Sequence, residues 1–277
     1  MSGTLFLVGT PIGNLSDFSP RAIATLEEVD FIAAEDTRVS LKLLNHFGIK
    51  KPLVSYHQHN STAAGQAILA RLLNGETCAL VTDAGMPAIS DPGEDLVRLC
   101  GQNNIEVQTV PGPSALISAL ALSGLPTGRF TFEGFLTTEK KERRAHLQSL
   151  VAEQRTMIFY EAPHKLKGTL SDLFDTFGDR PISLCRELTK LHEETIRTTI
   201  AAAIRYYNDT DPKGEYVLVV AGAEPAEEFS VTLEEGVAMV LKRREQGERM
   251  KDAVRQVCAD TGLNKNELYE AALKAGG

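Results

Sequence analysis

The first 123 residues alternate between short apolar runs and longer segments whose apolar positions recur at helical spacing. Short continuous apolar runs are typical of buried parallel strands, and the longer spacing is typical of amphipathic helices. Strands that alternate with helices indicate βαβ units and a mainly parallel sheet. The pattern predicts strands at residues 4–8, 30–35, 52–56, 77–82 and 105–110, and helices at 20–28, 38–47, 61–74, 94–103 and 114–123.

A second α/β pattern follows the glycine- and proline-containing segment 123–128. Two of its strands, 182–187 and 194–200, follow each other with no helix between them, which indicates an antiparallel pair. We therefore expect a domain at residues 1–123 and a mixed α/β domain at residues 124–223. The second domain has predicted strands at 130–135, 156–161, 182–187, 194–200 and 215–220, and helices at 139–153, 163–177 and 200–208.

The end of the chain has a purely helical pattern. Residues 221–230 are typical of a linker. Thr232 and Glu235, and again Asn264 and Glu267, have the spacing of a capping box that opens a helix, and helices at 250–261 and 264–275 have helix-turn-helix spacing. We expect residues 231–277 to form a small helical module that either docks RNA or stabilises a dimer.

Composition narrows the class of protein. The longest apolar stretch, 115–122, is far shorter than the roughly 20 residues that span a bilayer, and the four cysteines show no metal-ligand spacing. We expect a cytoplasmic protein without a membrane span or a bound metal. The net charge of −8 argues against wholesale binding of nucleic acid, so such a role would depend on two basic stretches. These contain Lys140, Lys141, Arg143 and Arg144, and Lys242, Arg243, Arg244, Arg249, Lys251 and Arg255.

Three glycine- and proline-rich loops each follow a predicted strand, at residues 9–14, 82–93 and 110–115. Ligands of open α/β sheets bind at the carboxyl ends of strands. Glycine allows close approach to the backbone, and proline restricts the loop. The first loop alone is equally compatible with a plain tight turn, because it matches neither the Walker nor the GxGxxG pattern. Together the loops predict one ligand site.

The loops also carry polar groups. Asp83 and Asp91 are suited to accept hydrogen bonds from ribose hydroxyls or a cationic amine, and the amides of Ser114 and Ala115 open a helix and favour a carboxylate. His57 follows another strand in a loop that either contacts RNA or is merely solvated. Charged residues after strands of the second domain either form surface ion pairs or belong to the site: Glu161, Lys165, Arg186, Glu187 and Lys190.

Eight motifs in this order resemble the tetrapyrrole methylase superfamily, and most closely its ribosomal RNA branch. They are VGTPIGNLxD (8–17), AEDTR (34–38), YHxHN (56–60), TDAGxPxISDPG (82–93), VPGPSA (110–115), YExPHKL (160–166), RELTK (186–190) and EYVLVV (215–220). Tetrapyrrole-modifying relatives carry GxGxGD and SGDP-type loops where this chain has GTPIGN and DAGMP, a difference that favours RNA as the substrate.

The resemblance implies two α/β domains with a cofactor cleft between them. It implies an S-adenosyl-L-methionine-dependent enzyme that methylates the 2′-hydroxyl of a cytidine ribose in the decoding region of 16S rRNA, within the small ribosomal subunit. It also implies a homodimer. The implied cofactor residues are Thr10, Pro11, Ile12, Asp83, Gly85, Met86, Ala88, Ile89, Ser114, Ala115, Phe159, Tyr160, Leu188, Gly214 and Glu215.

A ribose hydroxyl is a poor nucleophile, so a general base or hydrogen-bond acceptor near it should accelerate the transfer by about 10²–10⁴-fold. The leading catalytic candidates are Asp83, His57, Lys165 and Glu187, with Lys165 or Arg186 alternatively binding phosphate. Two other functions stay open: a methyltransferase acting on a tetrapyrrole, another small molecule or a protein side chain, and a non-enzymatic ribosome-assembly module.

Overall fold

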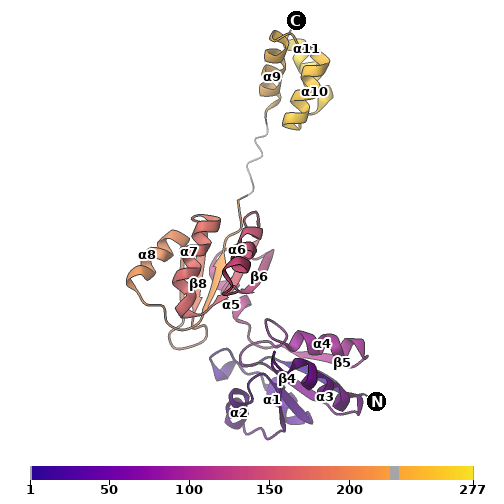
Figure 1. The fold of residues 1–277 in the computed structure, drawn as a ribbon, viewed down its shortest axis with the longest axis vertical. Coiled ribbons are helices and arrows are strands. Elements are labelled where there is room, and N and C mark those ends of the chain that lie inside the picture. Colours follow the sequence, from indigo (N-terminus) through magenta and orange to yellow (C-terminus); the bar gives the residue numbers. More distant parts are fainter. Residues whose placement is uncertain (1, 225–230, 277) are drawn as a thin grey trace. The chain divides into compact units, whose positions relative to one another are not determined.

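The computed structural model describes residues 2–224 and 231–276. The chain divides into two units, Met1–Ala223 and Glu224–Gly277, each held together by its own contacts. The first unit contains two separate five-stranded sheets, and the second is helical (Figure 1). These elements confirm the predicted α/β fold class with additional C-terminal helices.

The first sheet is parallel throughout, with the strand order β3-β2-β4-β1-β5. Its strands are β1 Thr4–Val8, β2 Phe31–Ala34, β3 Leu53–Ser55, β4 Cys78–Val81 and β5 Glu106–Val110. Strands β2 and β4 are buried along their whole length because helices cover both faces. Helices α1 (Pro20–Glu28) and α2 (Thr37–His46) cover one face, and α3 (Ser61–Leu73) and α4 (Gly93–Gln102) cover the other.

The second sheet is mixed, with the order β6-β7-β10-β8-β9. Strands β6 and β7 are parallel, whereas the remaining pairs are antiparallel, including the predicted pair β8 and β9. Helices α6 (Lys140–Ser149), α7 (Leu166–Phe177) and α8 (Ile200–Asp209) build a core on one face. The strands are β6 Phe130–Phe135, β7 Thr156–Glu161, β8 Pro181–Arg186, β9 Glu194–Thr199 and β10 Tyr216–Val220.

Helix α5 (Ala115–Ser123) covers the opposite face of the second sheet. Its Leu116, Ala119 and Leu120 form one core with Ile158 and Val219 of that sheet. The sequence places this helix with the first domain, residues 1–123, because it directly follows the fifth strand. Its apolar residues lie all around the helix, so their pattern carries no sign of the sheet that they cover. By its packing, α5 belongs with the second sheet, so the boundary between the cores of the two sheets lies before α5 rather than at residue 123.

The second unit is a bundle of α9 (Leu233–Glu245), α10 (Met250–Thr261) and α11 (Lys265–Ala275), which contact one another pairwise. Thr232 and Glu235 form the predicted capping box, and the Asn264 side chain accepts hydrogen bonds from amides at the start of α11. Of the predicted linker, residues 225–230 lie outside the described part of the chain. Within the described residues, no helix has the length and apolar character needed to cross a membrane.

Candidate functional site

Backbone hydrogen bonds join the loop after β1 to the loop after β4. The Thr10 amide donates to the Gly85 carbonyl at 2.9 Å, and the Gly85 amide donates to the Thr10 carbonyl at 3.1 Å. The Thr10 hydroxyl also donates to the Thr82 carbonyl at 3.2 Å. Thr10 is only 1% exposed, and its hydrogen bonds fasten the two loops together.

The loop after β5 meets the other two loops at a contact between glycines. The Gly9 amide donates to the Val110 carbonyl at 3.1 Å, and the Gly112 amide lies 3.2 Å from the Met86 sulfur. A Cβ on Gly9 would lie 2.7 Å from the Gly112 Cα, which is closer than real side chains approach. Glycine is therefore required where the backbones cross, and the three loops form one contiguous surface.

Asp91 shapes the loop after β4. Its carboxylate accepts hydrogen bonds from the amides of Ala88, Ile89 and Gly93, at 3.0, 3.2 and 2.7 Å. Ala88 and Ser90 hold positive φ angles of 67° and 63°, a conformation that costs free energy for residues other than glycine. The carboxylate offsets this strain and holds the loop against the cavity.

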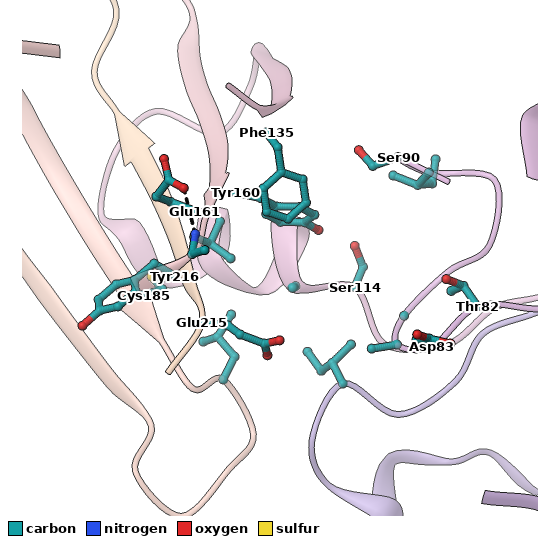
Figure 2. A pocket seen from close by; sticks show the side chains of 18 of the residues that line it. Thr82, Asp83, Ser90, Ser114, Phe135, Tyr160, Glu161, Cys185, Glu215 and Tyr216 are labelled. Carbon is teal, nitrogen blue, oxygen red and sulfur yellow. Dashed lines mark hydrogen bonds between the residues drawn. The ribbon is translucent and has the colours of Figure 1, made fainter. Parts of the chain in front are cut away.

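A cavity of about 650 Å³ lies between these loops and the ends of β7, β8 and β10 (Figure 2). Its size falls within the roughly 300–1,000 Å³ that is usual for ligand pockets. We call it the cofactor cleft. Of the residues predicted to bind cofactor, its lining includes Ile12, Asp83, Gly85, Met86, Ile89, Ser114, Ala115, Tyr160, Leu188 and Glu215.

Other predicted cofactor residues lie next to the cleft but outside its lining: Thr10, Pro11, Ala88, Phe159 and Gly214. Phe159 is fully buried in the core beneath α7, because neighbouring residues of a strand point to opposite faces and Tyr160 faces the cleft. Gly214 has φ +78°, and a Cβ there would lie 2.6 Å from the Glu187 carboxylate carbon. These positions shape the cleft from behind.

Asp83 presents its carboxylate to the cleft from the first sheet (Figure 2). Partial burial raises its pKa, and the neighbouring carboxylates of Glu35 and Asp36 raise it further. Its Oδ1 accepts a hydrogen bond from the Asp36 amide at 3.1 Å. The Glu35 carboxylate accepts one from the Thr82 hydroxyl at 2.7 Å. Asp83 therefore has remaining capacity to accept hydrogen bonds from a ligand.

Glu187 lines the cleft from the second sheet, where its carboxylate is already paired. Lys190 Nζ lies 3.0 Å from Glu187 Oε1 and 2.9 Å from Glu215 Oε2, and the Glu215 amide donates to Glu187 at 3.1 Å. Burial tends to raise the pKa of Glu187, but the hydrogen bonds from Lys190 and the Glu215 amide outweigh it and lower that pKa. Glu187 is consequently a weak proton acceptor.

The other two catalytic candidates lie outside the cofactor cleft. The His57 amide donates to the Asn60 side chain, and the His57 ring packs edge-on against His59 with 5.9 Å between centroids. Lys165 ends the short 3₁₀ turn Pro163–Lys165 and lines a second cavity, beside α6 and α7. The structure thus brings together Asp83 and Glu187, but not His57 or Lys165.

Several cleft residues were not predicted as ligands. Phe135 is 61% exposed at the rim, and its ring packs against Tyr160 with 5.4 Å between centroids. An aromatic residue at the very end of a predicted strand was the available signal for it. Lys190 belongs to the RELTK motif, but its ion pairs with Glu187 and Glu215 depend on the fold. The remaining ones are Glu35, Thr82, Ala84, Ser90, Ala162, Pro163, His164, Cys185, Tyr216 and Val217. Asp91 and Glu161, which the sequence offers as site residues, also line the cleft, where Asp91 accepts hydrogen bonds from its own loop and Glu161 from Thr169.

The cleft is strongly acidic. Of the residues in segments 2–224 and 231–276, six carboxylates and one lysine line it, and this excess of negative charge suits a cationic ligand. The family described as Tetrapyrrole (Corrin/Porphyrin) Methylases matches residues 4–204, which include all three loops and most of the second sheet. The chain belongs to the tetrapyrrole methylase family. S-adenosyl-L-methionine is accordingly its methyl-donor cofactor.

Relatives within the tetrapyrrole methylase family match at high identity. The Ribosomal RNA small subunit methyltransferase I of Synechocystis sp. is 50% identical over 98% of this chain and 98% of its own. The protein of the same name from Thermotoga maritima is 50% identical over 222 residues, which are 80% of this chain and 100% of its own. That relative has about the length of the first unit alone.

Two solved structures share the fold at low identity. Diphthine synthase has a TM-score of 0.60 and 14% identity, covering 79% of this chain and 90% of its own. Uroporphyrin-III-C-methyltransferase from Thermus thermophilus has a TM-score of 0.55 and 20% identity, covering 79% and 94%. At these identities the likeness shows that the tetrapyrrole methylase fold is shared and no more.

The residues of the cleft fit the cofactor that the family implies. S-adenosylmethionine carries a sulfonium and an ammonium group, and the acidic lining complements both. Ile12, Met86 and Leu188 provide apolar surface, and Asp83 provides an acceptor for hydroxyl or ammonium groups. Helix α5 begins at the cleft beside Ser114, whose side chain forms no cap, so the positive end of the helix is available to a carboxylate.

Proposed function

We propose that this protein transfers a methyl group from S-adenosylmethionine to the RNA of the small ribosomal subunit. The specific acceptor that we propose is the 2′-hydroxyl of a cytidine ribose in the decoding region of 16S rRNA. The substrate assignment rests on the 50% identity, over nearly the whole of both chains, with a protein named as a small-subunit ribosomal RNA methyltransferase. The assignment of S-adenosylmethionine as the methyl donor is supported by the acidic cleft between the two sheets.

The protein's main contribution is to hold the donor and the acceptor in line. S-adenosylmethionine supplies an activated, electrophilic methyl group when bound. Asp83 accepts hydrogen bonds from the cofactor's hydroxyl or ammonium groups, and the start of α5 receives its carboxylate. Fixing the reactants in this way lowers the activation barrier by part of the roughly 7–11 kcal/mol that proximity and orientation can provide.

The predicted homodimer belongs to this proposal, since small enzymes of this kind commonly pair through two-fold interfaces. Leu191 is 93% exposed and Ile117 on α5 is 50% exposed, and apolar surface of this kind is available to a partner. Light scattering of the purified chain measures the mass directly and distinguishes a monomer from a dimer.

Labelled methyl transfer tests the function. The protein is incubated with S-adenosylmethionine carrying a labelled methyl group and, in parallel, with assembled small subunits, naked 16S rRNA, or uroporphyrinogen. We expect the label in ribosomal RNA, in a nuclease-resistant dinucleotide whose first nucleoside is 2′-O-methylcytidine. Label on a base would overturn the 2′-hydroxyl assignment, and label only on uroporphyrinogen would favour a tetrapyrrole methylase.

A further inference from the structure

A second cavity of about 760 Å³ adjoins the cofactor cleft, and His164 lines both. It lies between α6, the 3₁₀ turn Pro163–Lys165 and α7, on the second sheet's side of the cleft. Apart from Leu147 and Gly168, its lining is polar or charged: Thr137, Thr138, Lys140, Arg143, Arg144, Gln148, His164, Lys165, Thr169, Asp172, Asp175 and Thr176. We call it the basic cavity.

The charge of the basic cavity is opposite to that of the cofactor cleft. Four cations and two carboxylates line it, in a chain whose net charge is −8. Arg143 is occupied, because it donates to Asp172 at 2.6 Å and to the Thr169 hydroxyl at 2.8 Å. Lys140, Arg144 and Lys165 form no ion pair with any residue in segments 2–224 and 231–276. Three cations are thus free to bind an anion.

A series of hydrogen bonds, buried at Glu161 and Thr169, joins the walls of the two cavities. Glu161, which is 4% exposed and lines the cofactor cleft, accepts a hydrogen bond from the Thr169 hydroxyl. Thr169 in turn accepts from Arg143, whose other partner is Asp172. These hydrogen bonds hold in place the wall of the basic cavity that carries its cations. Phe135 lies at the rim of the cofactor cleft, two residues before Thr137 of the basic cavity.

We propose that the basic cavity binds the phosphodiester backbone of the substrate RNA, next to the nucleotide whose ribose enters the cofactor cleft. The proposal rests on the proposed function. Phosphates need unpaired cations, and contacts to phosphate fix the position of a strand without reading its sequence. The acidic cofactor cleft repels phosphates, so the strand's backbone takes the adjoining basic surface. Lys140, Arg144 and Lys165 contact the phosphates, and the exposed Phe135 ring stacks on a base.

The length of the Thermotoga maritima relative independently supports this position. That protein is named for the same activity, and 222 residues of this chain match it in full, against 223 residues in the first unit. A relative of that size has no room for both sheets and a three-helix bundle. RNA contacts essential to the reaction are therefore expected within the first unit, where the basic cavity lies.

The double variant Lys140→Ala/Arg144→Ala of the full chain tests the proposal. Its binding to small ribosomal subunits is measured by filter binding across a series of salt concentrations. We expect affinity to fall by about tenfold or more, since hydrogen bonds to charged groups are worth about 1.5–3 kcal/mol. The slope of log affinity against log salt should decrease by about 1.4, because each lost contact to a single strand removes about 0.7. S-adenosylmethionine binding, measured by calorimetry, should be unchanged.

The matched control is Arg21→Ala/Lys42→Ala, which removes one arginine and one lysine from exposed positions on α1 and α2. A separate variant, Lys165→Arg, keeps the positive charge and should retain most of the affinity. If the Lys140/Arg144 variant matches the control in affinity and in salt slope, the proposal is wrong, although wild-type methylation of RNA would still stand. If the wild-type chain neither binds nor methylates ribosomal RNA, both the proposed function and this inference fail.

Discussion

The Gly9→Ala substitution should weaken the binding of S-adenosylmethionine by about tenfold to a hundredfold. The new methyl group would lie 2.7 Å from the backbone of Gly112 and from the Met86 sulfur, and backbone atoms cannot rotate away as a side chain does. Overpacking of this kind costs about 1–3 kcal/mol and is relieved by separating the loops that form the cofactor cleft. Isothermal titration calorimetry measures the affinity, and thermal unfolding measures the accompanying loss of stability.

Gly101→Ala is the control for this substitution. Gly101 lies in α4, and among the residues that the structure describes, none outside its own helical turns would lie within 4 Å of a Cβ at this position. Alanine should stabilise the helix by about 0.5–1 kcal/mol and leave cofactor affinity unchanged. Wild-type affinity in Gly9→Ala would contradict the close crossing of the loops as the basis of the cleft.

Asp83→Asn should weaken S-adenosylmethionine binding by about tenfold to a hundredfold, while raising the melting temperature. The amide cannot match a carboxylate as a hydrogen-bond acceptor, and charge-assisted hydrogen bonds contribute about 1.5–3 kcal/mol. Its oxygen can still accept from the Asp36 amide, so the loop should keep its shape. A slower single-turnover rate at saturating cofactor, with unchanged affinity, would instead make Asp83 the proton acceptor of the reaction.

The stability effect of Asp83→Asn should depend on pH. Burial and the neighbouring carboxylates raise the Asp83 pKa in the folded state, so the folded protein holds this proton more tightly than the unfolded chain. The ionised carboxylate therefore costs stability above its folded pKa, and the cost disappears as pH falls below the unfolded value of about 3.9. The variant should be the more stable protein at neutral pH, with the difference fading in acid.

The sequence predicted the two α/β regions and the convergence of the loops because these depend on local signals. Apolar runs specify buried strands, and glycines mark the places where backbones approach closely, as Gly9 and Gly112 do. The position of α5 could not be predicted in this way. A helix that is apolar on every side gives no sign of its partner, and only the packing with Ile158 and Val219 assigns it to the second sheet.

The sequence motifs predicted the residues that line the cleft better than those that lie behind its lining and support it. Thr10 belongs to the same motif as Ile12, and Gly214 directly precedes the motif that contains Glu215. The fold uses Thr10 to fasten two loops and Gly214 to make room for Glu187. The pairing of Lys190 with two carboxylates joins residues from separate segments, which no local pattern reveals. The opposite charges of the two cavities likewise emerge only when the elements are assembled.

A crystal structure of the chain with S-adenosylmethionine bound tests the location of the cofactor most directly. We predict the ligand in the cofactor cleft, in contact with Asp83 from the first sheet and Leu188 from the second, with its carboxylate at the start of α5 beside Ser114. A ligand bound at any other place, or one that touches only one of the two sheets' residues, would contradict the account.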